Sequence, residues 1–210
     1  MKQRDSIQRR IFLTTLVFVL SGYFVSAFAL SWEESEDAAI FERGDIEAVG
    51  RLITTEPAYK NPGIVVRALQ AAISSRQVEL VKFLKTQGWF DVCLKRASCN
   101  PIHIAAQAGD SGEIMSLFVA EGFDPDAEDR VRYTPLHAAA AAGQLAAVKY
   151  LCGIGVDAAK ISLDERTPLQ EAKSRFAQTT RQPGNAYESE LGRKLDQVIK
   201  YLESGQCKKR

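Results

Sequence analysis

Two histidines, four cysteines and a short acidic run are the residues of this chain whose types could support chemistry. Cys93, Cys99 and His103 lie close together in the sequence, and thiolate and imidazole groups are ligands that zinc prefers. A structural zinc site takes four ligands, and the sequence offers no evident fourth. We therefore predict no metal site and no cofactor.

The acidic run consists of Asp126, Glu128 and Asp129. Alternating carboxylates occur in calcium-binding loops, but such a loop also needs a glycine at a set offset, and this run lacks one. We interpret the three side chains as a solvated loop tip. The chain also contains no G-x-S-x-G nucleophile elbow, no glycine-rich phosphate loop and no histidine-containing metal motif. These observations predict a protein without catalytic residues.

The elements that carry these residues form a repeat. Three segments superimpose on one another, and their prolines lie 34 and 33 residues apart: Asn100–Ala106, Thr134–Ala140 and Thr167–Ala172. A period in this range is typical of a helical solenoid, in which each unit stacks on its neighbours. The spacing therefore favours a binding scaffold over an enzyme.

Each repeat begins with strong helix-start signals. Thr134 and Thr167 stand where an N-cap hydroxyl accepts a hydrogen bond from a free backbone N–H, and Pro135 and Pro168 occupy the first helical position. Thr167 with Gln170 has capping-box spacing. The pattern predicts one helix after each Thr-Pro pair.

A second helix is predicted directly after the first. Small residues fill Ala138–Ala142, Gly143 stops that helix, and the apolar residues of Gln144–Cys152 recur at helical spacing. Gly155–Asp157 then ends the pattern, and an extended stretch leads to Thr167. Each unit is thus a pair of helices followed by a loop.

These residues resemble the ankyrin repeat. The stretch Tyr133–Asp157 follows the family pattern T-P-L-H-x-A-A-x-x-G-x-L-x-x-V-x-x-L, and fainter copies cover Arg67–Ala72 with Val78–Leu84, and Arg43–Val49. The resemblance implies an all-α solenoid of about five stacked helix-turn-helix repeats with short β-hairpin finger loops. The units are expected at 36–62, 63–99, 100–132, 133–165 and 166–205, the last one departing most because Gln178–Asn185 is a polar insertion.

The resemblance also implies roles for particular residues. His103 and His137 occupy the T-P-L-H position, where the family histidine ties neighbouring finger loops together by hydrogen bonds. Ankyrin proteins bind partners with the finger tips and the exposed face of the first helices. Carried over by position, that face contains Arg96, Gln107, Arg130, Val131, Tyr133, Leu163, Asp164, Arg166, Ser174 and Arg175. Arginine and tyrosine are favoured in interfaces, so an acidic protein surface is a plausible target, although these residues could equally serve only solubility.

The amino-terminal segment has the pattern of a signal peptide. Four basic residues precede an apolar run, Ile11–Ala29, that closes on the small-x-small sequence Ala27-Phe28-Ala29, which predicts cleavage after Ala29. Arg9-Arg10-Ile11-Phe12-Leu13 resembles the twin-arginine export motif, although Gln8 replaces the usual Ser or Thr. An uncleaved membrane anchor is the alternative, and both readings place the repeats on the same side of the membrane.

Composition fits one exported domain. Removing the leader from the 210 residues leaves 181, with 23 of the 27 basic and 25 of the 26 acidic residues, and this near balance predicts neither nucleic-acid nor membrane-surface binding. We divide the chain into a signal peptide at 1–29, a lead-in at 30–35, the repeats at 36–205 and a basic tail at 206–210. The predicted location is the periplasm of a bacterium.

All four cysteines follow the leader, and disulfides persist in exported proteins. Cys93 and Cys99 flank the predicted finger between the second and third repeats, so they either form a disulfide or remain two loop thiols. Cys152 lies on the apolar stripe of a second helix, which is most simply a buried thiol. Cys207 lies in the tail and is either free or bonded to Cys152, if the last helix folds back.

The sequence as a whole predicts an exported protein-binding module without enzymatic activity. Resemblance to exported bacterial ankyrin proteins suggests an accessory to a periplasmic enzyme, such as a catalase in oxidative-stress defence. An immunity-type inhibitor of a toxin and an enzyme with an unrecognised site at 176–188 are the alternatives. The expected partner is another protein, with no small-molecule substrate.

Overall fold

The computed structural model describes residues 36–95, 99–181 and 186–207. The chain divides into two units, Met1–Ala39 and Ile40–Arg210. Only residues 36–39 of the first unit are described, as the start of helix α2 (Glu36–Arg43). The predicted signal peptide with its apolar run Ile11–Ala29, and the cleavage point after Ala29, lie outside the described residues. Among the residues that are described, no helix has the length and apolar character needed to cross a membrane.

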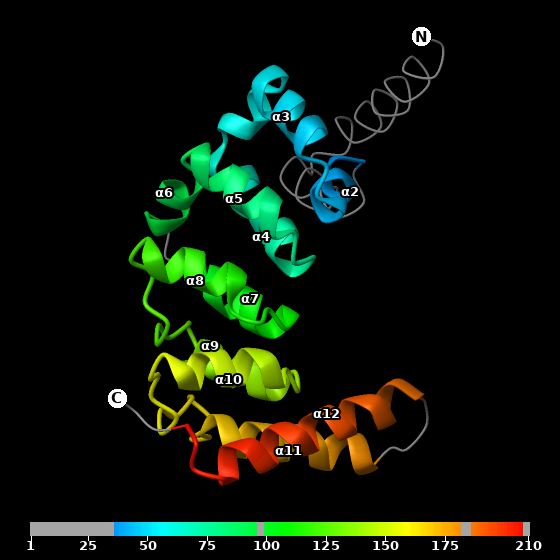
Figure 1. The fold of residues 1–210 in the computed structure, drawn as a ribbon, viewed down its shortest axis with the longest axis vertical. Helices are drawn as coiled ribbons and strands as arrows, with labels where there is room; N and C mark the ends of the chain where they lie inside the picture. The colour runs from blue at the N-terminus through cyan, green and yellow to red at the C-terminus, as the bar shows by residue number, and fades with distance from the viewer. Residues whose placement is uncertain (1–35, 96–98, 182–185, 208–210) are drawn as a thin grey trace, which may run out of the picture. The chain divides into compact units, whose positions relative to one another are not determined.

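The second unit consists of helices that follow one another in pairs (Figure 1). After α2 and α3 (Ile46–Thr55) come α4 (Pro62–Ser74) with α5 (Val78–Thr86), α7 (Pro101–Ala108) with α8 (Glu113–Ala120), α9 (Pro135–Ala141) with α10 (Leu145–Gly153), and α11 (Pro168–Arg181) with α12 (Ala186–Glu203). Two short helices, the 3-10 turn η1 (Pro57–Lys60) and α6 (Trp89–Leu94), stand outside this scheme. The prediction of an all-helical repeat solenoid is confirmed.

The first helices of the repeats form a continuous inner layer. α7 packs on both α4 and α9, and α9 packs on α11, while α5, α8, α10 and α12 each contact the first helix of their own pair. Ala105 and Ala106 on α7, and Ala139 and Ala140 on α9, are fully buried in this layer. Small side chains at these positions let successive helices approach closely, so they define the spacing of the stack.

The caps at the helix starts are made as the Thr-Pro pattern suggests. The Thr134 N–H donates to Nδ1 of His137 at 3.2 Å, and the His137 N–H donates to Oγ1 of Thr134 at 3.4 Å. Thr167 and Gln170 exchange the same two bonds, at 2.8 and 3.3 Å. The first turn of each helix therefore has partners for backbone groups that a helix alone leaves unpaired.

Aromatic side chains join the second repeat to its neighbours. The rings of Phe90 on α6 and Phe118 on α8 stack with centroids 4.1 Å apart, and Phe123 packs edge-on against Phe118 at 5.1 Å. Trp89, the residue before Phe90, lies against Tyr59 of η1. Both short helices thus contribute to the core, since Tyr59, Trp89 and Phe90 are buried.

Three details differ from the sequence-based expectation. No strand occurs in the described part of the chain, so the expected β-hairpin fingers are tight turns instead. Cys93 lies on helix α6 rather than at the base of a finger, because the apolar residues before it form one more buried turn of helix. The described part of the expected polar insertion is helical, because α11 continues to Arg181; 182–185 lie outside the described residues, and α12 begins at Ala186.

The four cysteines form two disulfides. Cys93 is bonded to Cys99, with Cα atoms 5.3 Å apart, and Cys152 on α10 is bonded to Cys207, with Cα atoms 4.6 Å apart. Cys152 is therefore not the simple buried thiol that its place on an apolar stripe suggests. The chain turns back after α12, at Gly205, whose φ of 69° few other residues adopt, and this turn brings Cys207 to α10. The second bond ties the end of the last repeat to the one before it.

The two disulfides should differ in their contribution to stability. They span 6 and 55 residues of sequence, and a crosslink that closes a longer loop restricts the unfolded chain more. We expect Cys99→Ser to lower the free energy of unfolding by about 2 kcal/mol and Cys207→Ser by about 4 kcal/mol. Urea denaturation of the oxidised proteins measures both values. Equal losses of unfolding free energy would show that loop length does not determine how much each disulfide stabilises the protein.

Candidate functional site

Two finger loops with the same backbone geometry lie between successive helix pairs. We call residues 129–133 the first finger and residues 162–166 the second finger. In each, the first residue donates its N–H to the carbonyl of the fifth, Asp129 to Tyr133 at 2.9 Å and Ser162 to Arg166 at 3.0 Å. The fourth residue has a φ of 57° in both. These shared bonds make each finger a closed turn that presents its second and third residues at the tip.

The two finger tips are joined through the backbone. The N–H of Leu163 donates to the carbonyl of Val131 at 3.0 Å. Both side chains remain largely in solvent, with 60% of Leu163 and 50% of Val131 exposed. The fingers thus form a short strip whose tips carry exposed apolar side chains.

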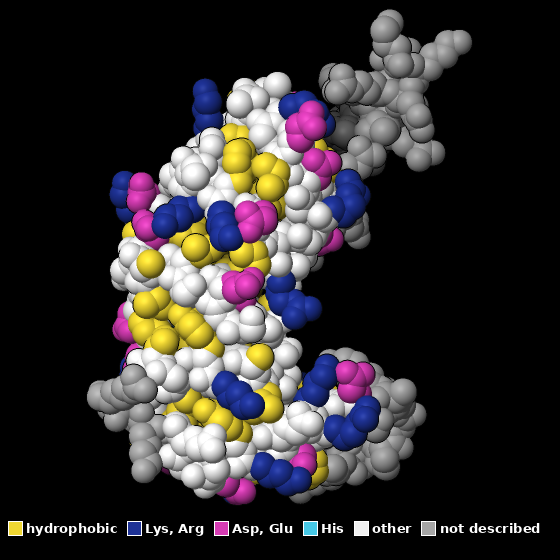
Figure 2. Space-filling view, viewed as in Figure 1, with side chains coloured by type: hydrophobic (Ala, Val, Ile, Leu, Met, Phe, Trp, Pro, Cys, Tyr) yellow, Lys and Arg dark blue, Asp and Glu magenta, His cyan; other side chains and the backbone are white. Residues whose placement is uncertain are grey.

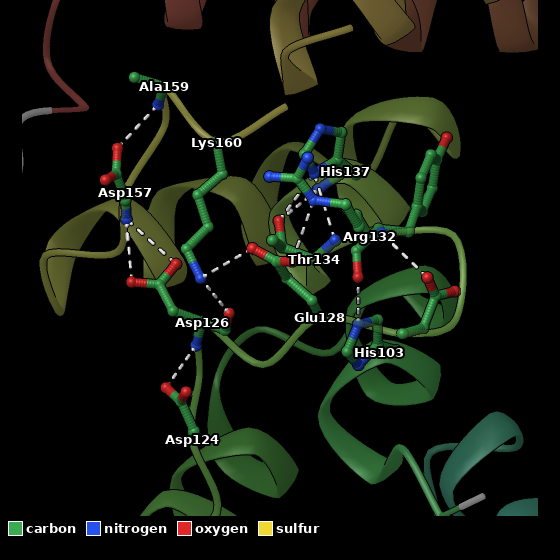
Figure 3. A network of polar contacts seen from close by, with 12 residues as sticks. His103, Asp124, Asp126, Glu128, Arg132, Thr134, His137, Asp157, Ala159 and Lys160 are labelled. Carbon is green, nitrogen blue, oxygen red and sulfur yellow. Dashed lines mark hydrogen bonds and ion pairs between the residues drawn. The ribbon is translucent and has the colours of Figure 1, made fainter. Parts of the chain in front are cut away.

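A buried histidine is hydrogen-bonded to the base of each finger. Nε2 of His103 on α7 is hydrogen-bonded to the carbonyl of Tyr133 at 2.9 Å, and Nε2 of His137 on α9 is bonded to the carbonyl of Arg166 at the same distance (Figure 3). Burial lowers the pKa of both imidazoles, an effect that the bonds to these carbonyls partly oppose. The rings are therefore kept neutral and serve as structural ties.

The acidic run expected to be a solvated tip is instead part of the link between repeats (Figure 3). The carboxylate of Asp126 accepts the N–H of Asp157 at 3.1 Å, and Nζ of Lys160 donates to the backbone carbonyl of Asp126 at 2.7 Å. Glu128 pairs with both Lys160 and Arg132 at 3.4 Å. Asp126 and Glu128 thus contact the backbone and Lys160 of the next repeat, while Arg132 belongs to their own loop.

The base of the fingers holds a polar cluster that sequence reasoning missed. The Tyr133 hydroxyl is hydrogen-bonded to Glu171 of α11, and burial together with this carboxylate raises the pKa of Tyr133. Nη1 of Arg166 lies 3.3 Å from Oε2 of Glu171, whose side chain is only 12% exposed. The finger side chains Tyr133 and Arg166 thus converge on one nearly buried carboxylate. The family pattern leaves the position of Glu171 variable, so only the packing of α11 on α9 reveals it.

The residues predicted to bind a partner separate into three groups. Arg96 lies outside the described residues. Tyr133 and Arg166 are partly buried and already engaged with Glu171, and Ser174 is partly buried. The remaining residues are exposed on the fingers and first helices: Gln107, Arg130, Val131, Leu163, Asp164 and Arg175.

These exposed residues offer charged, polar and apolar contacts for binding. Arg175 makes one side-chain hydrogen bond, to Gln178 at 3.4 Å, and over the described residues Arg130 makes none. No group of three or more His, Cys, Asp or Glu side chains in the described ranges is placed to hold a metal ion.

The comparison with known families agrees with the geometry. Residues 102–178 match the family model for ankyrin repeats, as three copies. No match was found among curated proteins. The resemblance seen in the sequence is thus confirmed for the segment that contains both fingers and both histidines.

The two fingers differ at their first residue. Oδ1 of Asp129 accepts the N–H groups of Val131 at 2.9 Å and Tyr133 at 2.8 Å, which closes the first finger on itself. The second finger has Ser162 at this position, and its buried Oγ has no hydrogen-bond partner within the described part of the chain. The second finger therefore lacks the side-chain acceptor that stabilises the first.

Substitution of these matched residues tests this difference. We expect Asp129→Ala to lower the free energy of unfolding by about 2 kcal/mol, because two backbone donors lose a charged acceptor. Ser162→Ala should change it by less than about 0.5 kcal/mol, since no bond is lost. Ser162→Asp should raise it by about 1 kcal/mol by supplying the missing acceptor. Urea denaturation measures all three, and similar losses for the two alanine variants would contradict the difference.

Proposed function

Since residues 102–178 of this chain are ankyrin repeats, we propose that the chain is a non-catalytic module that binds a partner protein through its fingers and first helices. The exposed tips Val131 and Leu163 support this proposal most directly. A family of protein-binding repeats presents its tips to solvent, and large apolar side chains exposed side by side favour contact with another protein.

The electrostatics of this surface favour local recognition. The exposed fingers carry Arg130 and Asp164, of opposite sign, and the face of the molecule seen in Figure 2 also mixes basic, acidic and apolar side chains without a large area of one sign. Arg166 pairs with Glu171 and Arg132 with Glu128, so over the described residues the arginines of this surface without an ion pair are Arg130 on the first finger and Arg175 on α11. A carboxylate on the partner that meets Arg175 is the acidic contact we propose.

We further propose that the protein works outside the cytoplasm as an accessory to a periplasmic enzyme, such as one in oxidative-stress defence. The signal-peptide pattern and the two disulfides support this location, because structural disulfides persist in oxidising compartments. An immunity-type role would use the same surface against a toxin. The identity of the captured partner separates these roles.

Export makes a direct prediction about the mature protein. We expect the form isolated from the periplasm to begin at Leu30, because the small-x-small pattern ends at Ala29. Amino-terminal sequencing of that form decides it. A chain that starts at Met1 and sediments with membranes would show that Ile11–Ala29 remains as an anchor. Replacing Arg9 and Arg10 by lysine should block export only if the twin-arginine route is used.

The binding face makes a second prediction. Arg175→Glu should weaken capture of the partner from periplasmic extract at least about tenfold at low salt, because it reverses an exposed charge at the proposed contact. Added salt should reduce the difference, since exposed charges are screened. Arg193→Glu, an exposed change on α12, is the matched control and should bind normally. Titration of the purified partner against each variant gives the values, and equal affinity for both would move the site away from α11.

A further inference from the structure

The two finger tips carry opposite charges. The first finger has Arg130 and Arg132, and the second has Asp164 and Glu165. Over the described residues Arg130, Asp164 and Glu165 have no ion pair, while Arg132 pairs only with Glu128 at 3.4 Å and keeps about half of its side chain exposed. Two adjacent tips therefore present unpaired charge of opposite sign to solvent.

Each finger also carries an exposed apolar side chain beside its charged residues. Val131 is the third residue of the first finger and Leu163 the second residue of the second finger, and the bond from the Leu163 N–H to the Val131 carbonyl holds the two residues next to each other. Their exposed fractions are among the largest of the hydrophobic residues described. The strip thus carries two adjacent apolar side chains, with basic residues on the first finger and acidic residues on the second.

We propose that a second copy of this chain docks on this strip, finger tips against finger tips, about a two-fold axis between the fingers. The axis places the first finger of one copy on the second finger of the other, so that Arg130 faces Asp164 of the partner copy at two equivalent places. Val131 and Leu163 of both copies meet at the centre. Such an isologous contact requires a surface that is complementary to itself, which this strip is.

The charge pattern favours a second copy over other occupants. Like charges placed against each other weaken an interface. A uniformly acidic partner would be repelled by Asp164 and Glu165, and a uniformly basic one by Arg130 and Arg132. A second copy offers both signs and can place each opposite its complement. The proposed contact uses only two short turns of each copy, and we expect it to bury less surface than the about 1,200 Å² that stable interfaces bury. The dimer is therefore weak and exchanges rapidly with the monomer.

This inference rests on the proposed function only in using the fingers as a binding surface. The first-helix positions Gln107 and Arg175 stay open in the dimer, so two copies can engage a partner at two places. When two linked sites bind at the same time, the overall affinity exceeds that of either site alone, although each site makes the same contacts as before. The dimer thus adds avidity to the proposed module.

Charge reversal at one finger tests the dimer. Sedimentation velocity of the purified mature chain over a range of concentrations, at low salt, should show association for the natural sequence. Arg130→Glu and Asp164→Arg should each weaken it at least about tenfold, because each change reverses two equivalent contacts. An equimolar mixture of these two variants should associate again, since every facing pair is then of opposite sign. Arg193→Glu should behave as the natural chain.

A failure of the dimer can be told apart from unfolding of a variant and from a failure of the proposed function. Both variants change exposed residues, and an unaltered circular dichroism spectrum shows that each remains folded. A natural chain that stays monomeric at the highest concentration overturns the proposal, and so does a mixture that associates no better than either variant alone. Capture of the heterologous partner is measured separately with Arg175→Glu. A missing dimer with intact capture would leave the proposed function standing.

Discussion

The hydrogen bond from a buried histidine to the carbonyl at the base of the next finger is the contact on which this structure depends. His103 and His137 make it at the same distance, 2.9 Å, to Tyr133 and Arg166. Each bond crosses about one repeat of sequence, so it fixes a loop on the helix layer of the preceding unit. Burial lowers the imidazole pKa values and keeps the rings neutral. This tie fixes the base of each finger, and the contacts of Tyr133 and Arg166 with Glu171 add to it.

The stack continues from this tie through local contacts. Alanines let α7, α9 and α11 pack closely, and the loops between repeats are linked by the bond from Asp157 to Asp126 and by Lys160. Because each unit contacts only its neighbours, stability is approximately a sum of units and of interfaces between them. The terminal repeats have one neighbour fewer. At the C-terminal end, the Cys152–Cys207 disulfide supplies an additional link to the preceding repeat.

The surface that results is polar at its base and apolar at its tips. Tyr133 and Arg166 are drawn inwards by Glu171, so side chains that would otherwise serve a partner are used to hold the fingers in place. This leaves Val131 and Leu163 outermost, with unpaired charges on either side. A base held by several contacts, with a small exposed area at the tips, suits binding to a partner.

The sequence alone determined the repeat and its helices, because Thr-Pro starts, helical spacing and a period of 33 to 34 residues act locally and recur. It also placed both histidines, and six of the ten residues that it predicted for the binding face are exposed. Only the tertiary structure decided what meets across repeats: the pairing of Cys152 with Cys207, the capture of Arg166 by Glu171, and the folding back of the acidic run. These contacts join residues far apart in the chain, so no local pattern encodes them. The short helix α6 likewise forms because its apolar side chains find a core to enter, which is a property of the neighbouring repeats.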